Sequence, residues 1–236
     1  MNLGQHTLTS YDRQLQHLMQ LIQDMGEEVK KMVLASKASF RSRDKERVVD
    51  AKAADKHINE LDRLIEEEAT IVLALQNPKA IDLRFVTSVL KITGMLERAG
   101  DLAKNTVKRS VKMGTFAPEP VIQKLEMMAD IIAEMLDGAL ESFTNKDPQK
   151  AMEVWKRDQQ IDDLYHDIFA LMQQEMAASP QNIVACTHVV FAAKNLERVA
   201  DYTTNLAKTV YYVISGKRVD KAVLKQGDLP EDTLLN

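Results

Sequence analysis

The feature that most constrains this chain is a ten-residue segment that occurs twice, one hundred positions apart. Residues 96–105 read LERAGDLAKN, and residues 196–205 read LERVADYTTN. Both copies place a Glu, an Asp and an Asn four residues apart, beside an apolar stripe. Because residues four apart share one face of a helix, each copy predicts a helix that carries an acidic row. The repeat indicates the internal duplication of a helical unit.

A second correspondence supports the duplication. Three residues of the first half recur 103 positions later, namely Asp55, Ile58 and Leu61 as Asp158, Ile161 and Leu164. This offset differs from that of the acidic segment by three residues, which fits a change of length in a turn between helices. Helix-forming residues dominate the composition, and only 5% of the residues are aromatic. The chain is therefore predicted to be helical throughout.

Apolar periodicity and the spacing of Pro and Gly predict six long helices. Five are expected at about residues 10–36, 44–76, 81–113, 121–144 and 148–178, and a sixth ends at Ser215 before Gly216. Thr9 and Ser10 are candidate N-caps of the first helix. Asp147 is predicted to cap the fifth helix, with Pro148 in its first position.

These helices predict an all-α fold of two similar antiparallel three-helix bundles, related by pseudo-twofold symmetry. The first bundle is expected over residues 1–116 and the second over residues 117–216, with a flexible charged C-terminal tail over residues 217–236. Helices of about 30 residues span about 45 Å. The molecule is therefore expected to be elongated, with its bundles packed along their lengths or end to end.

The composition narrows the function classes. The chain is 45% hydrophobic and 28% charged, which is typical of a soluble globular protein. Its net charge of −4 gives no support to nucleic-acid binding. It has no apolar run that would span a membrane, no signal-peptide pattern at the N-terminus and a single cysteine, Cys186. A reducing, cytoplasmic location is expected.

The second half carries the fuller set of carboxylates. Asp158 and Asp162 lie four apart on the predicted fifth helix, and His166 extends their row. The sixth helix offers the matching row, which consists of Glu197, Asp201 and Asn205. If the two helices are antiparallel neighbours, four carboxylates converge, and such an oxygen-rich cluster suits Mg²⁺, Ca²⁺, Mn²⁺ or iron. A metal site is predicted here, to which His166 could add a nitrogen ligand.

The first half offers a weaker version of the same arrangement. Its rows consist of Asp55 and Asn59 opposite Glu97, Asp101 and Asn105. Because Asn59 puts an amide where the other half has a carboxylate, a weaker or differently charged site is expected. From the residues alone, ion pairs with Arg98, Arg198 or lysines of neighbouring helices explain the acidic rows as well as metal binding does.

Catalysis has little support in the sequence. A ferritin-like di-iron enzyme needs Glu-x-x-His on two helices. The nearest approach is Asp163-x-x-His166, which occurs once. The chain has no glycine-rich phosphate loop and no Ser/His/Asp grouping. A non-catalytic protein is expected, with a di-metal carboxylate enzyme of a ferritin-like type and a metal-free helical scaffold as the alternatives.

The doubled Leu-Glu-Arg-x-x-Asp-x-x-x-Asn motif resembles the PhoU family of phosphate-signalling proteins. Residues 77–86, which read NPKAIDLRFV, also resemble the segment that leads into that family's third helix. The resemblance covers about residues 5–216. It implies two three-helix bundles, homodimers and no catalytic activity. It does not extend to the segment after Gly216.

The resemblance also implies a function and its partners. The family represses the phosphate-starvation response and restrains phosphate uptake, by linking the ATPase PstB of the Pst phosphate transporter to the membrane histidine kinase PhoR. The protein would then meet the membrane only through these partners. The acidic rows, at Glu97, Asp101, Glu197 and Asp201 with Asp55, Asp158 and Asp162 opposite, would bind metal ions such as Mg²⁺, Mn²⁺, Zn²⁺ or iron, with no organic cofactor.

Overall fold

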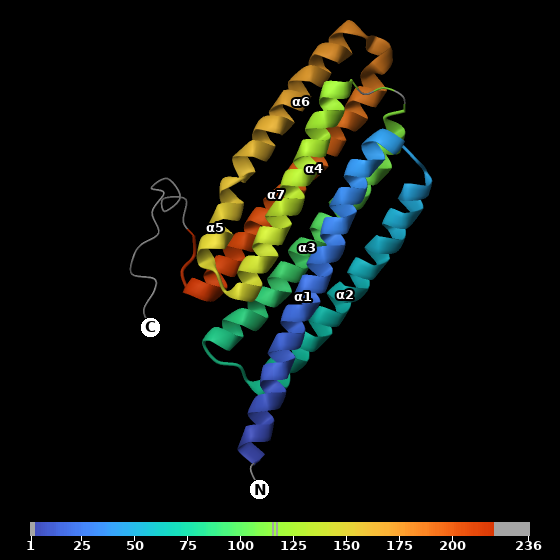
Figure 1. Cartoon of the computed structure of the whole chain (residues 1–236). Coiled ribbons are helices and arrows are strands. Elements are labelled where there is room, and N and C mark those ends of the chain that lie inside the picture. Colours follow the sequence, from blue (N-terminus) through green and yellow to red (C-terminus); the bar gives the residue numbers. More distant parts are fainter. Residues whose placement is uncertain (1–2, 115, 117, 220–236) are drawn as a thin grey trace.

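The computed structural model describes residues 3–114, 116 and 118–219, and this part is built from helices joined by short connections (Figure 1). The helices in chain order are α1 (Leu3–Ser42), α2 (Glu46–Gln76), α3 (Ile81–Lys112), α4 (Glu119–Asn145), α5 (Pro148–Lys156), α6 (Asp158–Ala178), a 3₁₀ turn (Pro180–Asn182) and α7 (Ile183–Ser215). The all-α prediction is confirmed. No helix of the described part is long and apolar enough to cross a membrane.

Several helices begin or end at the residues that were predicted to mark their ends. Asn77 adopts the left-handed conformation after α2, with φ 46°, and Gly216 does so after α7, with φ 71°. The Asp147 side chain accepts hydrogen bonds from the backbone N–H groups of Gln149 (3.0 Å) and Lys150 (3.1 Å), so it caps α5 as predicted.

Two boundaries differ from the prediction. The helix expected over residues 148–178 is divided at Arg157, which keeps φ −80° and ψ −14°, so α6 follows α5 directly with no loop between them (Figure 1). α1 is longer than expected at both ends, and Ser10 lies inside it. At its far end, the hydroxyls of Ser36 and Ser39 donate to backbone carbonyls one turn earlier, and the helix continues.

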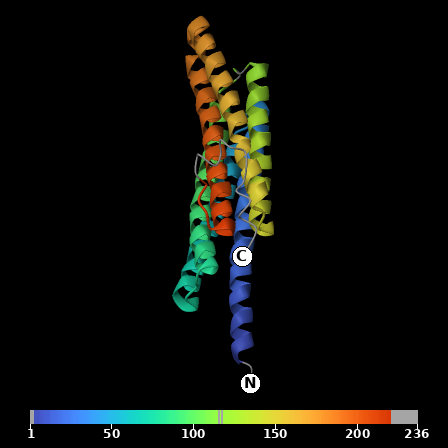
Figure 2. The same ribbon diagram turned by 90° about the vertical axis from the view of Figure 1, so that its left-hand side faces the viewer.

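The two halves pack side by side along their lengths. α3 lies against α7, α1 lies against α4, and the two pairs are joined by the contacts of α1 with α3 and of α4 with α7, so these helices form a central four-helix bundle (Figures 1 and 2). α2 covers one side of this bundle, and α5 with α6 covers the other. The bundles were expected to pack either along their lengths or end to end, and they pack along their lengths.

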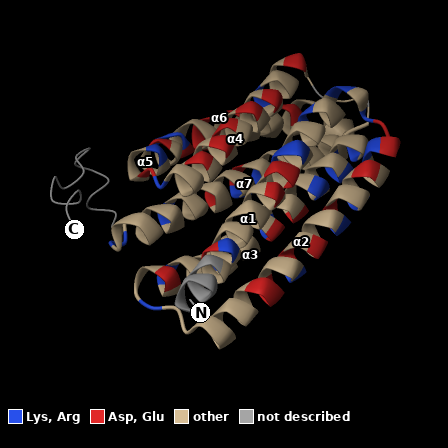
Figure 3. Ribbon diagram, turned by 60° about the horizontal axis from the view of Figure 1, so that its bottom comes forward, with Lys and Arg blue, Asp and Glu red and all other residues tan. Residues whose placement is uncertain are grey.

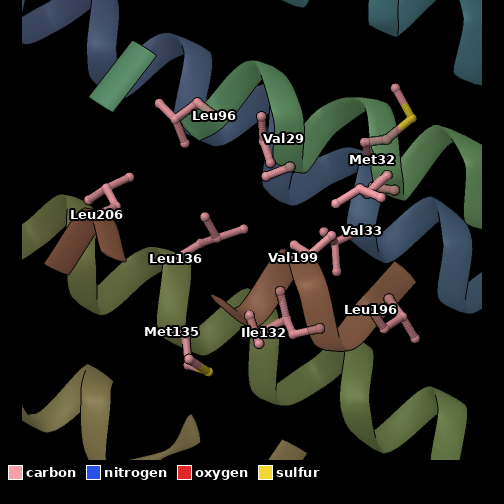
Figure 4. Close-up of a cluster of buried hydrophobic side chains, with 14 of the residues drawn as sticks. Val29, Met32, Val33, Leu96, Ile132, Met135, Leu136, Leu196, Val199 and Leu206 are labelled. Carbon is pink, nitrogen blue, oxygen red and sulfur yellow. The ribbon is translucent and has the colours of Figure 1, made fainter. Parts of the chain in front are cut away.

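The core crosses the boundary between the halves. The buried side chains of the cluster in Figure 4 come from all four central helices: Val29, Met32 and Val33 from α1, Leu96 from α3, Ile132, Met135 and Leu136 from α4, and Leu196, Val199 and Leu206 from α7. Residues 1–116 and 117–216 therefore share one apolar core. The predicted tail lies outside the described residues from residue 220 on.

A ladder of ion pairs joins α1 to α4 beside this core. Lys30 lies 2.7 Å from Asp137, and Lys37 lies 2.7 Å from Asp130. Arg41 lies 2.6 Å from Glu126 and 2.9 Å from Glu119. α1 supplies the cations and α4 supplies the carboxylates.

Candidate functional site

The predicted acidic rows form two seams. The first seam lies between α2 and α3 and consists of Asp55, Asn59, Glu97, Asp101 and Asn105. The second seam lies between α6 and α7 and consists of Asp158, Asp162, Glu197 and Asp201. In both halves the helices that carry opposing rows pack against each other, as predicted.

An ammonium group holds the first seam together. Lys104 Nζ lies 2.8 Å from Asp55 Oδ2 and 2.7 Å from Asp101 Oδ1, and only 12% of the Lys104 side chain is exposed. Burial alone would lower the pKa of Lys104, but the hydrogen bonds to Asp101 and Asp55 outweigh it and raise the pKa. Asn105 Nδ2 donates to Asp101 Oδ2 at 3.1 Å. The first seam therefore carries its own cation.

A further carboxylate, that of Asp62, contributes to the field of the first seam. Asp62 lies seven residues after Asp55, so it continues the α2 row along the same helix face. Burial raises the pKa of Glu97, Arg98 opposes this rise, and the charges of Asp62, Asp101 and Asp55 add to it. Burial also raises the pKa of Asp62, with Glu66 adding to the rise.

The second seam has no ammonium at the equivalent place. Thr204 stands where the first copy of the motif has Lys104, and its Oγ1 donates to Asp158 Oδ1 at 3.2 Å. The nearest cation is Lys194, whose Nζ lies 2.7 Å from Glu197 Oε1 and 2.6 Å from Oε2 and sits 5.1 Å from the centre of the Tyr165 ring. Only Oε1 lies in a direction suited to a hydrogen bond, so the buried Oε2 accepts none from the described residues.

The carboxylates of the second seam repel one another. Burial raises the pKa of Asp162, and the charges of Asp158 and Glu197 raise it further against the opposing effects of His166 and Lys194. Burial likewise raises the pKa of Asp201, with Glu197, Asp158 and Asp162 adding to the rise. Each group therefore costs stability when it is ionised at neutral pH, and a cation between the rows would relieve that cost.

The two seams differ in how well they fit a metal ion. Within the described ranges, no three His, Cys, Asp or Glu side chains lie close enough together to hold one. In the first seam, the Lys104 ammonium already bridges the two rows. In the second seam, the carboxylate oxygens suit a hard cation, but the Lys194 ammonium already pairs with Glu197, and the side chains would have to close around a metal ion.

Two candidate ligands are exposed and make other contacts. His166 is exposed, and its Nδ1 donates to the backbone carbonyl of Asp162 at 2.7 Å. Asn205 is exposed and lines a separate pocket with Lys91 and Lys208. The sequence analysis did not single out Lys104, Asp62 or Lys194. For Lys104 a signal existed, because position 104 is the only one in the repeated segment where one copy is charged and the other is not.

Comparison with known proteins gives a consistent result. The PhoU domain model matches this chain twice, over residues 22–110 and 125–210, once in each half. The phosphate-specific transport system accessory protein PhoU homolog of Rhizobium meliloti is 33% identical, over 97% of this chain and 94% of that protein. The homolog of Caulobacter vibrioides is 35% identical, over 92% of this chain and 95% of that protein.

Solved structures show the same architecture. The crystal structure of PhoU from Pseudomonas aeruginosa superposes with a TM-score of 0.83 at 26% identity, over 88% of this chain and 100% of that chain. The phosphate transport system regulatory protein PhoU from Streptococcus pneumoniae superposes with a TM-score of 0.81 at 28% identity, over 89% of this chain and 99% of that chain.

Proposed function

This chain belongs to the PhoU family, and from that membership we propose that it is a regulatory accessory protein of phosphate transport. It restrains phosphate uptake and represses the phosphate-starvation response when phosphate is plentiful. It acts as an adaptor between a PstB-type transporter ATPase and a PhoR-type histidine kinase. The observation that carries the proposal is the match of the family model to both halves of the chain.

The architecture suits an adaptor. The long helices share one core, and Lys, Arg, Asp and Glu are interspersed along their outer faces (Figure 3). Such charge-patterned surfaces favour specific contacts that can be released. We propose that the protein works in the cytoplasm as a homodimer without catalytic activity and reaches the membrane only through its two partners.

The adaptor proposal predicts both a phenotype and a set of partners. In a bacterium that lacks its own PhoU protein, expression of this chain should return a phosphate-starvation promoter to its repressed level in phosphate-rich medium. Affinity-tagged chain from phosphate-rich cells should recover the transporter ATPase and the kinase, and recovery should fall after phosphate starvation. Reporter activity and mass spectrometry of the recovered proteins provide the measurements. Repression with neither partner recovered would contradict the adaptor mechanism.

A second proposal concerns metal binding, and it is limited to the second seam. Asp158, Asp162, Glu197 and Asp201 supply four carboxylates, they repel one another, and one buried oxygen of Glu197 accepts no hydrogen bond from the described residues. We propose that a divalent or iron-type cation joins α6 to α7 through these groups. The first seam needs no such ion because the Lys104 ammonium already bridges its two rows.

Substitution of Asp162 by Asn should have opposite effects with and without metal. With a chelator present, the variant should be more stable than the wild type by about 0.5 kcal/mol, because one like-charge contact is removed. With Mn²⁺ present, the wild type should gain stability and bound metal while the variant gains less of both. Thermal unfolding and elemental analysis measure the two effects.

The matched control is Asp163→Asn, because Asp163 is the next residue on α6 and its exposed carboxylate accepts from Gln159. If Asp162→Asn kept the wild-type metal content, the second seam would not be the metal site. If the wild type itself bound no Mn²⁺, the protein would be a metal-free adaptor. Turnover of oxygen or of phosphate esters by metal-loaded protein would instead support the ferritin-like enzyme alternative.

A further inference from the structure

A pocket of about 430 Å³ lies between α3 and α7, where the two halves of the molecule meet. Its cations are Lys91 from α3, Lys208 from α7 and Arg218 just beyond the end of α7. Ser88, Asn205 and Tyr212 contribute further polar groups. The described residues that line the pocket include no Asp or Glu. The pocket therefore gathers positive charge on a chain whose net charge is −4.

These cations lack carboxylate partners. Within the ranges that the structure describes, no ion pair involves Lys91, Lys208 or Arg218. Lys208 Nζ lies 5.1 Å from the centre of the Trp155 ring, and the Arg218 guanidinium lies 5.8 Å from that of Tyr212. Aromatic faces position both cations without neutralising them. Three like charges around one hollow favour an anion between them.

The duplication provides an internal comparison. At the equivalent positions of the other half, one hundred residues away, Ser88 corresponds to His188 and Lys91 to Phe191. There the Arg109 guanidinium lies 3.2 Å from His188 Nδ1 and 4.7 Å from the centre of the Phe191 ring. Two ring side chains thus pack on the cation in that copy. In the pocket, a serine and a lysine take the places of the two rings and Thr209 takes that of Arg109, which leaves the hollow open between Lys91, Lys208 and Arg218.

We propose that this pocket binds a small phosphorylated anion, either inorganic phosphate or a phosphate ester. Ammonium and guanidinium groups are the donors that phosphate oxygens accept most strongly, and the Asn205 amide and the Tyr212 hydroxyl can add hydrogen bonds. The volume accommodates a group larger than one phosphate. Because α3 and α7 belong to different halves, the ligand contacts both. This inference goes beyond the proposed function, which concerns protein partners.

Isothermal titration of the full-length chain with phosphate, pyrophosphate and AMP at constant ionic strength tests the proposal. At least one of these compounds should bind, and the compound that binds most tightly distinguishes free phosphate from an ester. Lys91→Gln and Lys208→Gln should each weaken binding about tenfold, the loss expected when one charged hydrogen-bond donor is removed. Trp155 fluorescence provides a second readout, because Lys208 lies over that ring.

The matched control is Lys108→Gln, since Lys108 corresponds to Lys208 in the other half. It should bind like the wild type. The proposal is overturned if none of the three compounds binds at millimolar concentration, if sulfate binds as tightly as the best of them, or if Lys108→Gln weakens binding as much as Lys208→Gln. All of these measurements use the isolated protein, so they stand independently of whether it recruits a transporter ATPase or a kinase.

Discussion

Replacement of Lys104 by threonine, the residue at the equivalent place in the second seam, should lower the free energy of unfolding at pH 7 by about 2 kcal/mol. Loss of one partner from a buried ion pair costs more, about 3–5 kcal/mol, but Asp101 is 40% exposed and water replaces part of the interaction. The variant leaves Asp55 and Asp101 facing each other without the ammonium that bridges them. Urea denaturation followed by circular dichroism measures the change.

The stabilisation that Lys104 provides should depend on pH in a definite direction. Because the folded-state pKa of Lys104 is raised, its stabilisation is fully present below the unfolded pKa and is lost as the pH rises through the folded pKa. The wild type therefore keeps this contribution at neutral pH. In the variant, the repulsion between carboxylates should decline as they become protonated. The difference in stability between the two proteins should therefore shrink as the pH approaches about 4.

Two further variants test the assignment of this effect to the seam. Lys108 lies one turn after Lys104 on α3, and its ammonium donates only a 3.4 Å hydrogen bond to Asn105. Lys108→Thr should therefore lower the free energy of unfolding by less than about 0.5 kcal/mol. Addition of Asp55→Asn to Lys104→Thr should restore part of the lost stability, because it removes one of the stranded charges. Equal costs for the two lysine variants would show that Lys104 does not hold the seam together.

The second large effect is expected at Ile65, a fully buried residue of α2. Ile65→Ala should lower the free energy of unfolding by about 3 kcal/mol and the Tm by about 10 °C. α2 packs against α1 and α3, which belong to the first half. The single tryptophan, Trp155, lies on α5 in the second half. Because the core is continuous across the halves, both halves should unfold together. The midpoint temperature measured by Trp155 fluorescence should therefore fall by as much as the midpoint temperature measured by circular dichroism.

The control for this variant is Leu64→Ala, one position away on α2, where the side chain is 39% exposed and its removal should cost far less. An Ile65→Ala protein whose Trp155 transition stays at the wild-type temperature, while helicity is lost in two steps, would contradict the shared core. Residues 1–116 and 117–216 would then be independent domains.

Much of the fold could be predicted because its breaks are marked by particular residues. Asn77, Asp147 and Gly216 each have a local chemical reason to end or begin a helix. The turn at Arg157 could not be predicted, since neither Pro nor Gly occurs there. Likewise, the first helix was predicted to end near residue 36, but Ser36 and Ser39 satisfy their hydroxyls within α1, and the helix continues to Ser42.

The candidate site was predicted in outline but not in its charge balance. The repeat correctly paired α2 with α3 and α6 with α7, because acidic rows beside an apolar stripe must face the neighbouring helix. Lys104 was missed because a lysine beside acidic residues also fits a solvated surface. The two Asn residues of the repeat differ in place, because Asn105 donates to Asp101 in the first seam whereas Asn205 is exposed and lines the pocket between α3 and α7.

The ion-pair ladder between α1 and α4 would tolerate a misaligned assembly. A slide of one helical turn toward the C-terminal end of α4 would bring Lys30 opposite Glu141, Lys37 opposite Glu134 and Arg41 opposite Asp130, so every cation would still meet an acid. Charge therefore strengthens the association of the halves without choosing between these two alignments. That choice depends on shape, because a methyl group at Gly26 would lie 2.6 Å from the end of the Leu140 side chain. One turn along, Leu140 would meet a lysine in place of this glycine, so the alignment of the duplicated halves depends on an absent side chain.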